Sequence, residues 1–404
     1  MSADQVPSPR LRLRLRAAAS PLLGLPWGQP LSTWSAPDAG VVEVPLGAGR
    51  HVVRVVRAGD RLWALKELPR WAAEREHAAL GELERRAVPA VRPVGLVTRE
   101  ADGDAVLITE YLPDTVLWRD LLTHAPDSAE RQARVCEAVA VFLVDLHRRG
   151  VFWGDCSPSN LLFRRDGRAL QPLLVDAETA EVRPSLTDGQ RTHDLQILQD
   201  NLAGGLLDLC AEQGRAADLE RLLAETGTVR ARYDALWQAL HAEATLPFAR
   251  RLDAVSEVAR LNELGYSVDE VRLASVGPGR DDVRLQTVVA QRRHHAAELR
   301  ALTGLQVGEG QAAVLLGDLR SHARSLPALP ERDVVRSWLD EVLHPALERL
   351  SGSLGGPRDV VQDYCDLLEV RWLLSERAGR DVGDEPAVAA LAATPVRARA
   401  RLIA

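Results

Sequence analysis

The size and composition of the chain describe an ordinary globular protein. It has 404 residues, of which 46% are hydrophobic and 26% are charged, and its formal net charge is −7. A single hydrophobic core stops growing at about 250 to 300 residues, so we expect two or three cores. The apolar fraction excludes a disordered chain, and the lack of long uncharged apolar runs argues against a membrane-spanning helix. The acidic balance gives no reason to expect nucleic acid as a partner.

The cysteines and the first residues predict a reducing compartment. The four cysteines are scattered without the spacing of a zinc site or a disulfide framework, so we expect reduced, partly buried thiols. The first twenty residues contain arginines but lack the continuous apolar stretch of a secretory signal, which predicts a cytoplasmic protein. Between Arg10 and Arg16, arginine alternates with leucine, and this pattern predicts an edge strand with one charged face.

The first third of the chain is predicted to be a sheet with one helix. Residues 41–68 are rich in valine and leucine and are interrupted by glycines, which indicates short strands joined by turns. Residues 69–86 have apolar positions at helical spacing behind a proline, so a helix is expected there. Residues 91–97 and 105–111 predict two further strands.

The rest of the chain is predicted to be mainly helical. Residues 129–149 form the clearest helix, and a strand-and-loop island follows at 151–177. Strands followed by helices suggest two lobes that meet near residues 110–114. A third region begins near Leu246, with a helix over 252–264 and a strand pair at 267–274 and 283–289.

Five polar residues occur in an order that indicates phosphoryl transfer. Lys66 lies on a predicted strand, and Glu76 lies on the helix that follows it. The segment GVFWGDCSPSNLLF contains Asp155, with Asn160 five positions later, and the apolar run in LLVDAETAE ends at Asp176. This order and spacing resemble the phosphate-binding lysine, its glutamate partner, the catalytic loop and the metal-binding strand of protein kinases.

The kinase resemblance implies a role for each of these side chains. Lys66 is expected to contact the α and β phosphates of ATP and to be held by Glu76. Asp155 is expected to orient the hydroxyl of the acceptor, whereas Asn160 and Asp176 are expected to bind Mg²⁺. Phosphoryl transfer depends mainly on positioning and charge neutralisation, so these groups must converge in the fold.

Further site residues follow from the same resemblance. Glu74 is a reserve choice for the partner of the lysine. Gly47 and Gly49 are expected to form the phosphate loop, which is poorer in glycine than a full glycine-rich loop. Glu110 and Leu112, at the expected crossover between the lobes, are assigned to nucleotide binding.

The sequence departs from the protein-kinase pattern in two places. Gly154 stands before Asp155 in WGD instead of the His-Arg-Asp triplet, a form typical of small-molecule and lipopolysaccharide kinases. In DAE, Glu178 replaces the glycine of Asp-Phe-Gly, so it is either a further metal ligand or a solvated acid. Asp194 in HDL resembles the aspartate that holds the catalytic loop from below, which is a structural role.

Segments outside this core extend the resemblance to most of the chain. They include PLLGLPWGQPLSTW, LNELGYSVDE, LTGLQVGEGQA and LEVRWLLSERAGRDVG. Together they resemble a bacterial lipopolysaccharide-kinase-like family with an appended uncharacterised domain. The implied fold is α+β: a bilobal protein-kinase-like fold with an additional, mainly helical C-terminal domain. The expected boundaries are 1–109 for the N-terminal extension and N-lobe, 110–245 for the C-lobe, and 246–404 for the C-terminal domain.

The C-terminal region offers its own candidates. Arg292, Arg293, His294 and His295 form a basic cluster that either receives a phosphorylated or acidic partner or is a solvated helix face, and the sequence favours the solvated face. Core packing is expected to explain Trp372. Since no tract rich in glycine, serine or proline precedes this region, we expect it to pack on the kinase-like part.

Two functions compete at this point. The first is an ATP- and Mg²⁺-dependent phosphotransferase that acts on a hydroxyl of a small molecule, glycan or protein. The second is a pseudokinase whose nucleotide site regulates a protein partner bound by the C-terminal domain. The retained lysine, asparagine and aspartates favour the enzyme, whereas the sparse glycine loop and the DAE triplet favour the pseudokinase. A nucleic-acid-binding function rests only on two basic segments and is opposed by the acidic balance.

Overall fold

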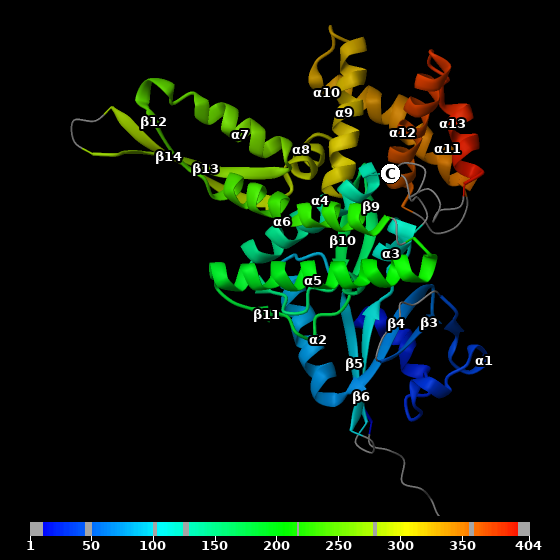
Figure 1. Ribbon diagram of the computed structural model, residues 1–404. Coiled ribbons are helices and arrows are strands. Elements are labelled where there is room, and N and C mark those ends of the chain that lie inside the picture. The colour runs from blue at the N-terminus through cyan, green and yellow to red at the C-terminus, as the bar shows by residue number, and fades with distance from the viewer. Residues whose placement is uncertain are drawn as a thin grey trace, which may run out of the picture. The chain divides into compact units, whose positions relative to one another are not determined.

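The structure divides into two compact units, which are described separately below. It is a computed structural model that describes residues 11–44, 51–99, 103–123, 129–215, 218–277, 281–354 and 359–394. The first unit is drawn from Met1–Trp118, Leu146–Phe163 and Pro172–Leu219, and the second from Arg119–Asp145, Arg164–Gln171 and Glu220–Ala404. Figure 1 shows the elements in chain order from blue to red.

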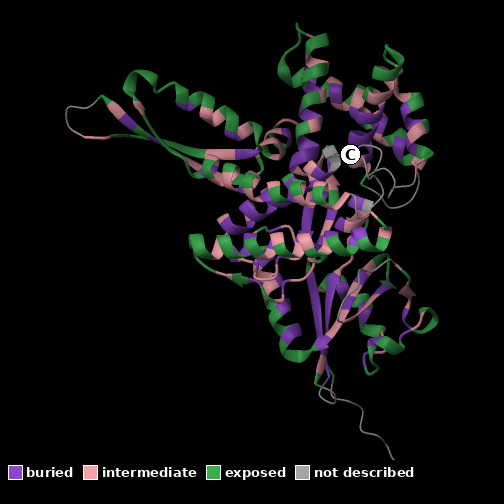
Figure 2. Cartoon of the chain, in the orientation of Figure 1, coloured by how far each residue is buried: buried purple, intermediate pink, exposed green. Residues whose placement is uncertain are grey.

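A six-stranded antiparallel sheet forms the core of the first unit. Its strand order is β1-β5-β6-β4-β3-β2. The strands are β1 (Leu11–Leu15), β2 (Val41–Val42), β3 (Val52–Ala58), β4 (Arg61–Pro69), β5 (Pro93–Arg99) and β6 (Asp104–Glu110). Every residue of β5 is buried, and β6 is buried except at its two ends (Figure 2). The strands predicted in this region are therefore confirmed.

The alternating segment near the N-terminus is an edge strand, as its pattern predicts. Among the strands that the structure describes, β1 pairs only with β5, with Leu13 opposite Val97. Leu13 and Leu15 are half-buried, whereas Arg12 and Arg14 are exposed. Leucine side chains on one face of a pleated strand pack on the core, while the alternate arginines remain in water and protect the edge from pairing.

Two tryptophans from the segment between β1 and β2 pack into the core on this sheet. This segment contains 3-10 helices at Ala17–Gly24 and Leu31–Thr33, and α1 (Ala36–Ala39). The rings of Trp27 and Trp34 meet edge to face at 5.1 Å, a favourable arrangement for aromatic pairs. Both rings belong to a core cluster with residues of β3, β4, β5 and β6.

Helix α2 (Arg70–Arg85) carries one buried polar residue on an otherwise apolar face. It begins directly after Pro69, and its buried side chains are those of Ala72, Ala73, Glu76, Leu80 and Leu83. This spacing follows the 3.6-residue repeat of a helix that packs one side on a sheet. The burial of Glu76 among alanine and leucine requires a partner, because an isolated buried carboxylate is strongly unfavourable.

Short strands and one long helix complete the first unit. They are β7 (Thr115–Leu117), β8 (Val151–Phe152), β11 (Glu181–Val182) and α5 (Asp188–Gln213). β9 (Leu161–Asp166) and β10 (Ala169–Leu174) form a hairpin whose tip, residues 164–171, is part of the second unit. The helix α5 starts with a capping box between Thr187 and Gln190 and ends at Gly214 in the left-handed conformation.

The second unit is mainly helical and contains one three-stranded sheet. The strands have the order β12-β14-β13 and are β12 (Glu243–Pro247), β13 (Tyr266–Ser275) and β14 (Asp282–Arg292). The pair β13-β14 and the helix before it confirm the sequence prediction, whereas β12 is not predicted. The helices are α3 (Trp118–Thr123), α4 (Ala129–Arg148), α6 (Leu219–His241), α7 (Asp253–Glu263), α8 (His294–Thr303), α9 (Glu309–Ser325), α10 (Glu331–Ser337), α11 (His344–Leu354), α12 (Val360–Ala378) and α13 (Asp384–Ala392).

The prediction that Trp372 packs in the core is wrong. Its side chain is 56% exposed. Helix α12 turns Tyr364, Leu367 and Val370 toward the buried cluster of the second unit, and Trp372 lies off this stripe. A tryptophan within a helix is thus buried only where its position falls on the packed face.

The state of the cysteines and the apolar character of the helices were also predicted from the sequence. All four cysteines are unpaired and buried. None of the helices in the described ranges combines the length and apolar character needed to cross a membrane.

Candidate functional site

Lys66 lies between two carboxylates that come from distant parts of the chain. Its Nζ donates to Glu76 Oε2 at 2.9 Å and to Asp176 Oδ2 at 2.8 Å. The lysine is on β4, Glu76 is on the buried face of α2, and Asp176 follows the end of β10. The structure therefore brings three of the predicted site residues into direct contact and supplies the partner that the buried glutamate requires.

The reserve candidate, Glu74, lies on the other side of α2. Its carboxylate accepts from Arg70 Nε at 2.9 Å, and both side chains are largely exposed. Of the two glutamates, Glu76 is the one that contacts the lysine, and its side chain is 1% exposed. Side chains two positions apart on an α-helix point in nearly opposite directions, so one of them can be buried while the other faces solvent.

The charges around Lys66 shift the pKa values of this group. Burial lowers the pKa of the lysine, but Glu76 and Asp176 outweigh burial and raise it above its usual value. Burial raises the pKa of Glu76 to about 7, the nearby Asp176 and Glu178 add to the rise, and the lysine opposes it. The lysine therefore stays charged at neutral pH, and the Glu76 carboxylate takes up a proton as the pH falls through about 7.

Asp155 and Asn160 lie together in one tight loop. Asn160 Nδ2 donates to Asp155 Oδ2 at 3.4 Å, and the carbonyl oxygen of Asp155 accepts from the amide of Ser157 at 2.7 Å. A 3-10 turn over Pro158–Asn160 gives the loop its shape. The side chains of Asp155 and Asn160 are both half-buried, so each retains access to solvent.

This loop is hydrogen-bonded to the segment that carries Asp176. The amide of Val175 donates to the carbonyl oxygen of Asn160 at 3.0 Å. The second oxygen of the Asp176 carboxylate, Oδ1, accepts from the amide of Glu178 at 3.1 Å. The backbone thus fixes the position of Asp176 from one side while Lys66 contacts it from the other. Glu178 is half-buried and influences the pKa of Glu76.

Asp194 holds the loop that carries Asp155 through hydrogen bonds to its backbone, as its sequence context suggests. Its fully buried carboxylate accepts from the amides of Trp153 and Gly154, each at 2.8 Å, and lies 3.1 Å from His147 Nε2. Gly154 has φ +80°, and a Cβ there would approach the carbonyl oxygen of Thr179 to 3.2 Å. The glycine of the WGD triplet is therefore required by backbone conformation.

Two supporting residues were missed by sequence reasoning. His147, on α4, contacts Asp194, and burial lowers its pKa, so the ring is neutral at pH 7. Asn201, on α5, donates through Nδ2 to the carbonyl oxygen of Cys156 at 3.2 Å. His147 precedes the loop by only a few residues in an apolar helix, which was a usable signal, whereas no pattern in the sequence singled out Asn201.

Among the predicted nucleotide-binding residues, Glu110 and Leu112 are described, and the polar contacts given for them lie outside this cluster. Gly47 and Gly49 lie outside the described residues. Glu110, at the end of β6, accepts from Arg92 NH1 at 3.3 Å, and the carbonyl oxygen of Leu112 accepts from Thr115 Oγ1 at 3.0 Å. Their assignment to nucleotide binding remains a prediction.

The oxygen atoms of the site are compatible with a magnesium ion that is bound by only one or two protein side chains. Across the described ranges, no group of three or more His, Cys, Asp or Glu side chains is arranged to hold a metal ion. Mg²⁺ prefers oxygen ligands and is commonly held by one or two side chains together with phosphates and waters. Asp176 and Asn160 offer oxygen ligands of this kind on hydrogen-bonded neighbouring segments.

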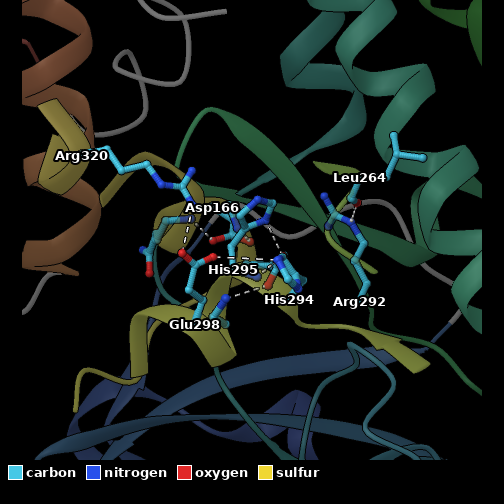
Figure 3. Close-up of polar contacts among 11 residues, drawn as sticks. Asp166, Leu264, Arg292, His294, His295, Glu298 and Arg320 are labelled. Atoms are coloured by element: carbon cyan, nitrogen blue, oxygen red, sulfur yellow. Dashed lines mark hydrogen bonds and ion pairs between the residues drawn. The ribbon is translucent and has the colours of Figure 1, made fainter. Parts of the chain in front are cut away.

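The basic cluster of the second unit is divided among several internal contacts. His295 Nδ1 lies 2.7 Å from Glu309 Oε1, and Glu298 is approached by both His294 at 3.8 Å and Arg320 at 2.9 Å (Figure 3). Arg292 Nε donates to the carbonyl oxygen of Leu264 at 3.2 Å (Figure 3). These side chains do not form one free basic surface.

Comparison with known proteins finds two family models that match separate parts of the chain. Residues 48–225 match the Lipopolysaccharide kinase (Kdo/WaaP) family, and residues 235–395 match a Domain of unknown function (DUF4032). A solved structure titled "WaaP in complex with acyl carrier protein" is 20% identical, covers 56% of this chain and 98% of its own, and has a TM-score of 0.36. The resemblance seen in the sequence is confirmed: the chain carries a Kdo/WaaP lipopolysaccharide kinase family domain followed by a separate DUF4032 domain.

Proposed function

We propose that the protein is an ATP- and Mg²⁺-dependent kinase that transfers the γ-phosphate to a hydroxyl group. The observation that carries the proposal is Lys66 held at 2.9 Å and 2.8 Å by Glu76 and Asp176. Membership of the first domain in a kinase family supports it. A charged lysine fixed between carboxylates is suited to neutralise phosphate oxygens, which is the main requirement of phosphoryl transfer.

The proposed nucleotide-binding groups have distinct tasks. Lys66 would contact the α and β phosphates of ATP, with Gly47 and Gly49 in the phosphate loop and Glu110 and Leu112 at the nucleotide. Asp176 and Asn160 would hold Mg²⁺, with Glu178 as a further oxygen donor. When bound, the metal ion neutralises charge on the β and γ phosphates. The backbone contacts of Asp176 reduce the loss of conformational freedom when a ligand binds.

The proposed chemical step depends on Asp155. Its carboxylate would accept a hydrogen bond from the acceptor hydroxyl, orient it and take its proton as the new bond to the γ-phosphorus forms and the bond from that phosphorus to the ADP leaving group breaks. Asn160 Nδ2 at 3.4 Å holds the carboxylate, and Asp194 holds the backbone before it at Trp153 and Gly154. The acceptor class remains broad: a hydroxyl of a small molecule, a glycan or a protein.

Nucleotide binding and phosphate transfer in Asp155→Asn test this proposal. Asp155 makes no contact with Lys66 or Asp176, so ATP affinity should stay within about threefold while turnover falls by a factor on the order of 100 or more. Slow ATP hydrolysis or autophosphorylation reports turnover before an acceptor is known. The matched control is Asp208→Asn, which replaces an exposed aspartate on α5 and should change neither ATP affinity nor turnover.

Two results would count against the enzyme. Turnover in Asp155→Asn equal to that of the wild type would remove the chemistry from this loop. A wild-type protein that binds ATP but transfers no phosphate to a broad acceptor panel would favour the pseudokinase instead.

A further inference from the structure

The second unit contains a cavity that the kinase-like site does not use. Its volume is about 850 Å³, within the range of small-molecule sites. The tip of the β9-β10 hairpin lines it together with α8, the start of α9 and the start of α12. Among the lining residues are Arg164, Arg165, Arg293 and Arg300.

Arg293, the residue directly before α8, and Arg300 within the helix flank alanines that line the cavity. Residues 293, 296, 297, 300 and 301 all line the cavity, which is the spacing of one helical face. Arg293 and Arg300 are separated by seven residues, or about 10 Å along a helix axis. The alanines between them leave the space over this face open.

Three of the four guanidinium groups have no acidic partner in the described ranges. Arg164 NH2 donates to Gln171 Oε1 at 2.8 Å, which is a neutral acceptor. For Arg293 and Arg300, both exposed, the structure gives no ion pair within those ranges. Arg165 differs, because its NH1 lies 2.5 Å from Asp366 Oδ1. The positive charge of the cavity therefore comes from Arg164, Arg293 and Arg300.

The two aspartates of the cavity do not cancel this charge. Asp166 (Figure 3) accepts from the amides of Gly310 and Gln311, both at 2.9 Å, and so caps α9. Asp359 accepts from the amide of Gln362 at 3.1 Å and from the side chain of Gln311 at 2.7 Å. Both carboxylates lie at helix N-termini, where the partial positive charge of the helix offsets theirs.

We propose that this cavity binds a small molecule with an oligophosphate chain or two separated phosphate groups. The planar guanidinium forms paired hydrogen bonds with phosphate oxygens, which makes arginine suited to such ligands. Since Arg293 and Arg300 start about 10 Å apart along the helix axis, an extended anion lets each guanidinium bind a separate phosphate group without the two side chains converging on one point. The alanine face accommodates an apolar body such as a nucleoside, and an inorganic oligophosphate satisfies the same charges.

Calorimetric titration of the full chain with inorganic tripolyphosphate tests the proposal. Wild type is expected to bind it, and Arg293→Ala/Arg300→Ala is expected to bind at least 30-fold more weakly. The control Arg324→Ala/Arg332→Ala removes the same charge from exposed positions on α9 and α10 outside the cavity. It should change the affinity by less than threefold.

The variant Lys66→Ala separates this cavity from the proposed nucleotide site. Tripolyphosphate binding that survives in Lys66→Ala and is lost in Arg293→Ala/Arg300→Ala supports the cavity, whether or not ATP is a substrate. Within the Lys66→Ala background, binding that is also lost on adding Arg293→Ala/Arg300→Ala belongs to the cavity. For that binding, higher affinity for ATP than for tripolyphosphate assigns the site to a nucleotide, and equal affinity assigns it to the phosphate chain. No binding by the wild type, or loss only in Lys66→Ala, would overturn the proposal.

Discussion

The cluster around Lys66 in the first unit joins opposite charges through side chains, whereas the starts of α8 and α9 in the second unit bind carboxylates through backbone amides. Lys66 contacts two carboxylates directly. In the second unit, Asp166 accepts from two amides at the start of α9, and Glu309 accepts from the amides of His295 and Ala296 at the start of α8. The ion pairs of Lys66 require particular residue types at three positions. A carboxylate that binds backbone amides, which we call a backbone cluster, also requires that no neighbouring side chain block its approach to the main chain.

Glycines create the space for the backbone cluster. A Cβ on Gly308 would lie 2.1 Å from Asp166 Oδ1, and one on Gly310 would lie 1.9 Å from the Asp166 carbonyl oxygen. Gln362 completes the arrangement, since its side chain accepts from the amide of Gly167 at 2.8 Å and donates to its carbonyl oxygen at 3.0 Å. The tip of the hairpin is thus held by main-chain contacts that tolerate no added atom.

The largest expected effect tests this packing with Gly167→Ala. Gly167 has φ +61°, and its Cβ would lie 2.3 Å from the carbonyl oxygen of Gly310. Left-handed backbone in a residue with a Cβ costs roughly 1 to 2 kcal/mol, and the overlap with backbone adds 1 to 3 kcal/mol. We expect a loss of about 4 kcal/mol in the free energy of unfolding, measured by urea denaturation.

The control for this variant is Gly304→Ala. Gly304 has φ +79° but no atom within 4 Å of its Cβ position, so only the backbone strain applies and the loss should be about 1 kcal/mol. Equal losses in the two variants would show that conformational strain alone matters and that the close approach of Gly167 to α9 does not.

The second prediction concerns the buried carboxylate beneath the loop of Asp155. Asp194→Ala leaves the buried amide of Trp153 and its neighbour at Gly154 without their acceptor. Each buried unsatisfied donor costs about 1 to 3 kcal/mol, so we expect about 3 kcal/mol of lost stability together with reduced turnover. Asp208→Ala on the exposed face of the same helix should leave both unchanged. Full stability of Asp194→Ala would contradict a supporting role.

The sequence was informative where chemistry depends on residue type at a fixed spacing. Lys66, Glu76 and Asp176 were named from their order along the chain, and the structure joins them by hydrogen bonds. A further signal was present in the composition. Lys66 is the single lysine among the 50 lysine and arginine residues, and the two side chains are not interchangeable at a phosphate site.

The sequence was uninformative where contacts join distant segments through the backbone. The cap of α9 is Asp166, which lies 144 residues before the amide of Gly310, so no local capping pattern at the start of that helix reveals it. Strand β12 was missed because its residues are mostly exposed and lack a clear alternation. Trp372 was misplaced because residue type alone does not define the packed face of a helix.

The third prediction is a pH dependence of stability that arises from Glu76. The groups that face it are Lys66 on β4 and Asp176 and Glu178 after β10. Because its pKa rises from the usual 4.5 to about 7, the folded state retains a proton that the unfolded state releases. Its contribution is therefore fully present below pH 4.5 and is lost as the pH rises through 7. At about 1.4 kcal/mol for each pKa unit, the loss is at most about 3.5 kcal/mol.

Comparison of Glu76→Gln with Glu74→Gln measures this dependence. Urea denaturation between pH 5 and pH 8 should show wild type and Glu74→Gln losing stability relative to Glu76→Gln as the pH rises. Glu74 is paired with Arg70 on the exposed face, so its replacement should not alter the slope. Parallel curves for all three proteins would mean that Glu76 stays ionised throughout this range.

The last prediction separates the charge of Lys66 from its shape. Lys66→Ala should weaken binding of ATP with Mg²⁺ about 30-fold, or about 2 kcal/mol, by removing a charge from the phosphates. Lys66→Arg keeps the charge but replaces a compact ammonium with a larger planar fork, which does not match the 2.9 Å and 2.8 Å contacts to Glu76 and Asp176. We therefore expect Lys66→Arg to weaken ATP binding by at least about fivefold. Wild-type affinity in Lys66→Arg alone would show that positive charge is sufficient, whereas wild-type affinity in both variants would remove Lys66 from the nucleotide site and leave its two carboxylates as a structural pair.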